Sequence, residues 1–193
     1  MGTASLVLAT RNAHKLREFR RLLAPAGIEL EPLPDDVELP PEEASSFAGN
    51  ALVKARVAAN ATGRPAIADD SGIEAAALAG APGIFSARYA GADASDEENL
   101  AKLLQEAPAG SVVKYICALA YVDPASGDER LFYGECNGRL ASRTQGSGGF
   151  GYDPAFLPDE DPERTMAELS DLEKDAISHR GHAARALSGW LRP

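Results

Sequence analysis

The chain has 193 residues, of which 45% are hydrophobic and 25% charged, and these proportions are typical of a folded globular protein rather than a disordered or fibrous one. Nineteen basic and 29 acidic residues give a formal net charge of −10. Such an acidic surface repels a phosphate polymer, so it argues against a nucleic-acid groove without excluding a small phosphorylated ligand. The length predicts a single domain over residues 1–193.

Cys117 and Cys136 form no CxxC pair, and each lies in a strand-like segment, so we expect two reduced, buried thiols. The longest apolar run, near Ile116 to Val122, is too short to span a bilayer. The first ten residues lead directly into a strand pattern and lack the features of a secretory signal. We therefore expect a cytoplasmic protein with no membrane partner.

The first part of the chain alternates strand and helix patterns. The predicted elements are, in order, a strand over 5–9, a helix ended by Pro25 and Gly27, a strand over 28–33, a loop over 32–44, a helix over 46–61 and a brief strand over 66–68 that stops at Asp69. This alternation is typical of an α/β fold.

The second part adds a predicted β-hairpin. Its elements are a loop over 79–91, a helix opened by the capping box of Ser95 and Glu98, strands over 112–122 and 129–136, a glycine-rich loop over 145–154, and a last helical region with a capping box at Ser170 and Glu173. The two strands flank the turn DPASGD, so we expect them to pair antiparallel. Joined to the earlier alternation, they predict a mixed sheet.

The segment between the first strand and the first helix is a candidate phosphate loop. It consists of Thr10, Arg11, Asn12, Ala13, His14 and Lys15. A helix start offers unpaired N–H groups and a partial positive charge, to which Lys15 adds a full charge. The alternative is a simple turn with Asn12 as the N-cap and Lys15 in solvent.

Two adjacent carboxylates, Asp69 and Asp70, follow the brief strand and precede Ser71 and Gly72. They are costly to hold together unless a cation or hydrogen bonds compensate them, and hard oxygen ligands suit Mg²⁺. Because successive strand residues point to opposite sides, only one of the two needs to face a substrate. The alternative is a turn stabilised by aspartate side chains.

Two further segments carry candidate ligand groups. In the glycine-rich loop, the backbone can approach a ligand closely and the rings of Phe150 and Tyr152 offer a flat surface for a base, although glycine-rich turns are also common without a ligand. Near the C-terminus, Lys174, His179 and Arg180 supply potential cations. The alternative is that these residues form a solvated basic turn. His179 and His182 lie three residues apart, which suits zinc, but no cysteine or carboxylate lies at ligand spacing, and this argues against a zinc site.

The order of these motifs resembles the inosine/xanthosine triphosphate pyrophosphatase family. The matching segments are TxNxxK after the first strand, ADDSG, GAPGIFSARYAG, GGFGYDP and EKxAxSHRG, which run from about Leu6 to Leu187. The resemblance implies a two-lobed α/β fold with a long mixed sheet flanked by helices and the active site in the cleft between the lobes. It also implies a homodimer, a small nucleoside triphosphate as the substrate and Mg²⁺ as the cofactor.

The resemblance also implies roles for individual residues. The loop from Thr10 to Lys15 would hold the triphosphate, and Asp70 would be the catalytic carboxylate and a magnesium ligand, with Ser71 contacting the substrate. The nucleoside pocket would be formed by Phe150, Gly151, Tyr152, Asp153, Lys174, His179 and Arg180.

The family carries a further acidic metal ligand in a pattern like ExGxTFxENAxxKA. Here Glu42 fits that position best, with Glu43 as the alternative, while Ala44 replaces the usual glycine and Gly49 a usual glutamate. Lys54 of the same pattern reads as part of a solvated helix face, although its side chain could also reach the phosphates.

The resulting hypothesis is hydrolysis of ITP, dITP and XTP to the monophosphate and pyrophosphate. Asp70, directly or through the metal, would activate the attacking water. Arg180 has only donors, so a purine with a 6-keto oxygen would satisfy it and adenine would not. The alternatives are a pyrophosphatase for modified pyrimidine nucleotides and a nucleotide-binding module without catalysis.

Overall fold

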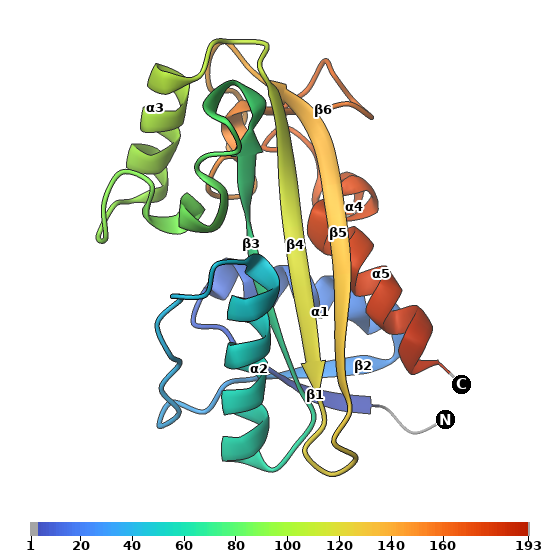
Figure 1. Ribbon diagram of the computed structural model, residues 1–193. Coiled ribbons are helices and arrows are strands. Elements are labelled where there is room, and N and C mark those ends of the chain that lie inside the picture. Colours follow the sequence, from blue (N-terminus) through green and yellow to red (C-terminus); the bar gives the residue numbers. More distant parts are fainter. Residues whose placement is uncertain (1–3, 193) are drawn as a thin grey trace. The chain divides into compact units, whose positions relative to one another are not determined.

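The computed structural model describes residues 4–192, and it contains one mixed sheet of six strands among them. The strands are β1 (Ala4–Leu8), β2 (Ile28–Pro32), β3 (Ala66–Ala75), β4 (Val112–Val122), β5 (Glu129–Leu140) and β6 (Phe156–Pro158), in the order β2-β1-β3-β4-β5-β6. The α-helices are α1 (Ala13–Leu23), α2 (Phe47–Thr62), α3 (Asp96–Glu106), α4 (Asp171–Ile177) and α5 (His179–Leu191). The predicted α/β fold with a mixed sheet is therefore confirmed (Figure 1).

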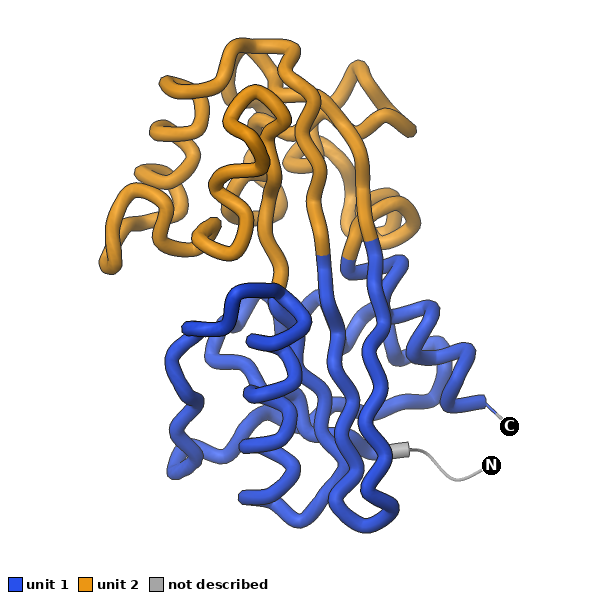
Figure 2. The backbone as a smooth tube through the Cα atoms, in the orientation of Figure 1, with its two compact units in different colours: residues 1–70, 117–134, 180–193 blue, residues 71–116, 135–179 orange. Residues whose placement is uncertain are grey.

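The chain divides into two compact units, which Figure 2 colours separately. Unit 1 contains residues 1–70, 117–134 and 180–193, and unit 2 contains residues 71–116 and 135–179. Strands β3, β4 and β5 each contribute one segment to each unit, so the chain passes between the units within continuous strands. Each unit has hydrophobic core clusters of its own, two of them on the opposite faces of the unit 1 strands.

In unit 1, helices cover both faces of the strands (Figure 1). Strand β1 pairs in parallel with β2 and β3, and its residues alternate between two cores. Leu6 and Leu8 pack with α1 and α5, whereas Val7 and Ala9 pack with α2. The alternation follows from the two-residue period of a strand, which sends successive side chains to opposite faces.

Among residues 4–192, alanine supplies nine of the twelve buried residues in the core cluster beneath α2. Ala51, Ala55, Ala58 and Ala59 of the helix are fully buried against small residues of the strands, among them Ala66, Ala68, Ala118 and Ala120. Small side chains allow a helix to approach a sheet closely, because no long side chain separates the two backbones. Helix α2 therefore lies close to β3.

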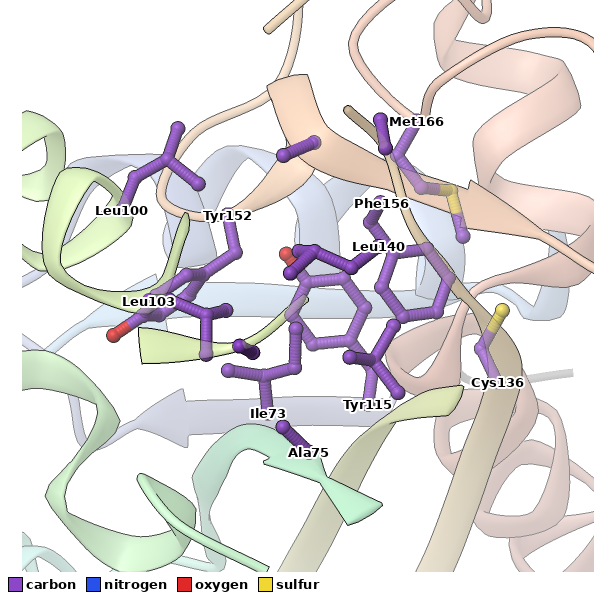
Figure 3. Packing of buried hydrophobic residues seen from close by; sticks show 14 of the residues in the cluster. Ile73, Ala75, Leu100, Leu103, Tyr115, Cys136, Leu140, Tyr152, Phe156 and Met166 are labelled. Atoms are coloured by element: carbon purple, nitrogen blue, oxygen red, sulfur yellow. The ribbon is translucent and has the colours of Figure 1, made fainter. Parts of the chain in front are cut away.

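In unit 2, the core gathers side chains from β3, α3, β4, β5 and the segment around β6 (Figure 3). Its largest members are aromatic, and Tyr115 and Phe156 stack with their ring centroids 4.5 Å apart.

Helices α3 and α4 begin at the predicted signals, because Ser95 with Glu98 and Ser170 with Glu173 form complete capping boxes.

Several predicted boundaries are wrong. Strand β3 does not stop at Asp69 but continues to Ala75, because both aspartates find cationic or amide partners on the flanking helices and Ile73 continues the buried run. Strand β5 extends to Leu140. The predicted loop over 79–91 contains a 3₁₀ helix over Gly83–Arg88, and the last helical region breaks at Ser178.

The two cysteines are buried and free, as predicted. Burial raises the pKa of both thiols, that of Cys136 to about 12, so both stay protonated near neutral pH. No helix among residues 4–192 is long and apolar enough to cross a membrane.

The alanine interface gives a stability prediction. Ala55→Leu inserts three carbons where the helix meets the strands, so we expect it to lower the free energy of unfolding by about 1–3 kcal/mol. Ala61→Leu, on the exposed side of the same helix, is the matched control and should stay within about 0.5 kcal/mol of the wild type. Urea unfolding of both variants measures the difference, and equal effects would contradict close packing at Ala55.

Candidate active site

The candidate site begins with two aspartates that point to opposite faces of β3. Ile67 packs with α1 and α5, and Ala68 packs with α2. Because side chains alternate along a strand, Asp69 should share the face of Ile67, and Asp70 should share the face of Ala68. The contacts agree, because the Asp69 carboxylate meets side chains of α1 and α5 and the Asp70 carboxylate meets side chains of α2.

On the first face, Asp69 holds two cations. Its Oδ2 lies 3.0 Å from Nζ of Lys15 and 3.4 Å from Nε of Arg180. Burial alone would raise the pKa of Asp69, but Lys15 and Arg180 outweigh it and hold the pKa well below its usual range. Glu18, one turn after Lys15, accepts a bond from Nη1 of Arg180 at 3.1 Å.

The loop that leads to Lys15 is fixed by its own side chains. Oδ1 of Asn12 accepts bonds from the N–H groups of His14 and Lys15, which makes Asn12 the N-cap of α1 as the sequence indicates. The N–H of Asn12 in turn donates to Oγ1 of Thr10. Lys15 itself is largely buried against Asp69, so the solvated alternative is wrong for this residue.

The side chains of Arg11 and His14 contact residues outside the carboxylate pair. The guanidinium of Arg11 donates to the backbone carbonyls of Leu33, Pro34 and Val37 at 2.7–2.9 Å, so it holds the loop that follows β2. His14 is exposed, and its Nδ1 lies 2.9 Å from the guanidinium of Arg17. Any phosphate contact from Arg11 would thus come from its backbone N–H rather than its side chain.

On the second face, Asp70 lies among side chains of α2 and the loop before it. Nδ2 of Asn50 donates to Oδ2 of Asp70 at 2.8 Å. Nζ of Lys54 lies 2.5 Å from Oε1 of Glu42, 2.7 Å from the backbone oxygen of Asp69 and 3.8 Å from Oδ1 of Asp70. Lys54 therefore joins the Glu42 and Asp70 carboxylates.

The charges on this face are tuned by burial and by one another. Burial raises the pKa of Asp70 and Glu42 raises it further, against the opposing effects of Lys54 and Asn50. Burial alone would lower the pKa of Lys54, but Asp69, Glu42 and Asp70 raise it above its usual value. Lys54 therefore stays charged, while the carboxylate of Asp70 is a stronger base than that of an exposed aspartate.

We call this group the carboxylate–cation cluster. It consists of Lys15, Glu18, Glu42, Asn50, Lys54, Asp69, Asp70 and Arg180, all of which lie in unit 1. A pocket of about 300 Å³ opens beside it, lined by Glu42, Asn50 and Lys54 together with Pro40, Pro41, Glu43, Ala44 and Val53. Solvent therefore reaches the Glu42 side of the cluster.

Sequence reasoning missed three members of the cluster. Lys54 was expected on a solvated helix face, but its side chain is only 8% exposed and ion-paired. Asn50 lies four residues before Lys54, and Glu18 lies three residues after Lys15, so each shares a helix face with a cation. That spacing was the available signal. Of the two candidate acids, Glu42 rather than Glu43 bonds to Lys54.

The predicted nucleoside residues do not all lie together: Arg180 belongs to unit 1, where Asp69 and Glu18 bind it, and the others lie in unit 2, most of them around the carboxylate of Asp153. Its Oδ2 accepts bonds from Nζ of Lys174 at 2.7 Å and from the N–H of Phe150 at 2.9 Å. Its Oδ1 accepts from the hydroxyl of Tyr115 at 3.1 Å. Asp153 thus anchors the glycine-rich loop internally.

The loop's conformation requires glycine at position 149. Its φ is +67°, and a Cβ there would collide with the carboxylate of Asp153. The N–H of Gly151 donates to Asp96 at the start of α3. The ring of Tyr152 is buried in the unit 2 core and its hydroxyl donates to the backbone oxygen of Ser86, so Phe150 is the more accessible ring of the loop.

The other predicted residues of unit 2 include Lys174, His179 and Ser71. Nζ of Lys174 lies 5.2 Å from the ring centroid of Phe150. His179, which is buried, stacks on Tyr115 with ring centroids 4.6 Å apart and planes 12° apart. Ser71 follows Asp70 in β3 and is half-buried, and Ala13 is the first residue of α1.

The structure thus defines a mixed-sheet α/β protein with a buried cluster of carboxylates and cations on one strand. The chain belongs to the Ham1 family, whose model matches residues 6–190. A dITP/XTP pyrophosphatase of Frankia alni is 49% identical over an alignment that covers 97% of this chain and 96% of the relative. A dITP/XTP pyrophosphatase of Cutibacterium acnes is 46% identical, with coverages of 94% and 93%.

Solved structures agree with this assignment. A HAM1 protein from Coxiella burnetii is 40% identical and superposes with a TM-score of 0.86, covering 97% of this chain and 98% of that one. The Ham1 protein of Staphylococcus aureus is 37% identical with a TM-score of 0.80, covering 97% of each chain. The resemblance seen in the sequence is confirmed.

The two departures from the family pattern lie against each other. A Cβ at Gly49 would lie 2.8 Å from Cβ of Ala44, a distance that side chains do not adopt without displacement. Gly49 also stands at N3 of α2, where a glutamate would complete a capping box with the N-cap Ser46. The glycine of the pattern at position 44 would leave room for its glutamate at position 49.

This packing predicts a coupled pair of substitutions. Gly49→Glu alone should lower the free energy of unfolding by about 1–3 kcal/mol through overpacking. In the Ala44→Gly background the same change should be neutral or stabilising, because the clash is gone and the capping box is complete. Urea unfolding of the two single variants and the double variant measures the coupling energy. Additive effects would show that the two positions do not interact.

Proposed function

We propose that the chain hydrolyses ITP, dITP and XTP to the nucleoside monophosphate and pyrophosphate. The observation that carries this proposal is the carboxylate–cation cluster, in which Asp69 and Asp70 hold Lys15, Arg180 and Lys54 on the two faces of β3. A triphosphate needs concentrated positive charge, and a hydrolytic site needs a base beside it. The names of the relatives from Frankia alni and Cutibacterium acnes support the same reaction.

Within this proposal, Asp70 accepts a proton from the water that attacks the α-phosphorus. Its raised pKa strengthens it as a base, and the bond from Asn50 holds its carboxylate in one orientation. Lys15 and the positive end of the α1 dipole stabilise the charge on the departing pyrophosphate. Asp69 keeps Lys15 and Arg180 in place.

The donor set fits Mg²⁺, which we propose as the cofactor. Asp70 and Glu42 both contact Lys54, so two hard carboxylates face one position for positive charge. Within residues 4–192 no three His, Cys, Asp or Glu side chains group as metal ligands, and Mg²⁺ commonly takes one or two carboxylates with phosphate oxygens completing its shell. A bound Mg²⁺ supplies charge neutralisation and polarisation of the phosphoryl oxygens.

The base would be bound by groups of unit 2, with Phe150 offering a ring face and Lys174 and His179 offering donors. Donors favour a 6-keto oxygen over the 6-amino group of adenine, and such a mismatch can reject the wrong base by about 10⁴-fold.

The test is pyrophosphate release from ITP with Mg²⁺, detected as phosphate after adding inorganic pyrophosphatase. We expect turnover of ITP, dITP and XTP, and little of ATP or modified pyrimidine nucleotides. A preference for the pyrimidine nucleotides would favour that alternative activity, and no turnover of any nucleotide would favour a binding module. Phosphate released without the added pyrophosphatase would contradict cleavage at the α-phosphorus.

Asp70→Asn keeps the shape of the side chain but removes the base. We expect kcat to fall by at least about 10²-fold while the melting temperature stays close to that of the wild type. Asp36→Asn, at an exposed aspartate of the same unit, is the matched control and should retain full activity. Near-normal turnover in Asp70→Asn would remove this residue from catalysis.

Substituting the two adjacent glutamates one at a time identifies the second metal ligand. Because Glu42 bonds to Lys54 in the cluster and Glu43 is exposed, Glu42→Gln should weaken Mg²⁺ binding about tenfold or more and Glu43→Gln should not. Calorimetric titration of the nucleotide-free variants with MgCl₂ measures this directly. A larger loss in Glu43→Gln would assign the ligand to the neighbouring residue.

The homodimer and the cytoplasmic location are part of the same proposal. The first rests on the family resemblance and the second on two free, buried thiols, which suit a reducing compartment. Sedimentation at equilibrium tests the dimer, and a monomer at micromolar concentration would exclude it.

A further inference from the structure

Tyr115 contacts two separate parts of the proposed nucleoside site and was not among the residues that the sequence indicated. It lies on β4 in the unit 2 core with 6% of its surface exposed. One side of its ring stacks against Phe156 (Figure 3), and the ring also stacks on the imidazole of His179 at 4.6 Å. Its hydroxyl donates to Oδ1 of Asp153.

The hydroxyl does not serve packing. The ring alone fills the space among apolar neighbours such as Val113, Leu140 and Phe156, and a phenylalanine would fill it equally well. A buried hydroxyl is costly unless it is bonded, so its value lies in its partner, the carboxylate of Asp153. That carboxylate is itself 3% exposed and binds Lys174 and the N–H of Phe150.

We propose that Tyr115 is a positioning residue for the purine, which acts through Asp153 and His179. The hydroxyl fixes the rotation of the Asp153 carboxylate, and that carboxylate places Lys174 and the Phe150 segment of the loop. The ring fixes the plane of the His179 imidazole. One side chain thereby sets the relative orientation of the groups that would bind the base. This proposal rests on the proposed function.

The role predicts a specific kinetic signature. Tyr115 lies in unit 2 and contacts Asp153 and His179, which belong to the proposed nucleobase-binding group. The carboxylate–cation cluster, with the proposed general base Asp70, belongs to unit 1. Tyr115→Phe removes the hydroxyl and keeps the ring, so the loop and Lys174 lose one restraint while the chemistry keeps its residues. We expect KM for ITP to rise about three- to tenfold and kcat to change less than about twofold.

Tyr133→Phe is the matched control, because Tyr133 is 57% exposed on β5 and the same oxygen is removed there. We expect its kinetic constants to equal those of the wild type. An unchanged KM in Tyr115→Phe, or a fall in kcat at constant KM, would overturn the positioning role. Melting temperatures of both variants exclude loss of folding as the cause of a raised KM.

The ring's role has a readout that needs no activity. The chain has three histidines, so the imidazole signals of His179 can be assigned in the NMR spectrum of the nucleotide-free protein by comparison with His14→Gln and His182→Gln. Tyr115→Leu removes the stacked ring and should shift the His179 ring protons strongly, whereas Tyr115→Phe should preserve their positions. Unshifted His179 signals in Tyr115→Leu would overturn the stacking role.

The two readouts also separate this inference from the proposed function. A wild-type protein inactive on ITP would reject the proposed function, and the His179 signals would still decide whether Tyr115 orients the imidazole. An active wild type with a normal KM in Tyr115→Phe would reject the role of the hydroxyl alone.

Discussion

The candidate site depends on the alternation of side chains along one strand. Two consecutive aspartates would repel each other if they shared a face, but β3 directs Asp69 toward α1 and α5 and Asp70 toward α2. Each carboxylate therefore meets its own cations, and burial strengthens these attractions because the interior screens charge less than water does. Two groups of charged side chains thus lie on opposite faces of β3, and a single peptide bond separates the two aspartates at their centres.

Unit 2 uses a carboxylate differently. Asp153 is surrounded by donors from three segments, Tyr115 on β4, Lys174 on α4 and the N–H of Phe150 in its own loop. A fully bonded, buried carboxylate is a structural anchor rather than a reactive group. The sequence motif that contains Asp153 thus marks where the loop is fastened, and the neighbouring Phe150 is the group that a ligand could meet.

Local signals predicted the fold well, because caps, turn glycines and apolar periods act within a few residues of one another. Asn12 and both capping boxes are examples. The prediction that β3 ends at Asp69 was wrong. A pair of charged residues normally ends a strand, but here both aspartates are compensated by Lys15, Lys54 and Arg180, which are distant in the sequence. Asn50 and Tyr115 were missed for the same reason, since their bonds to Asp70 and Asp153 span 20 and 38 residues.

The alanine seam beneath α2 has a consequence for how this protein can change. Lys54 reaches the backbone oxygen of Asp69 because small side chains, among them Ala55 and Ala58, let the helix lie close to β3. Larger residues in that seam would bury more apolar surface, yet they would lift the lysine away from both aspartates. The position of the Lys54 ammonium group therefore limits how large the side chains beneath α2 can become.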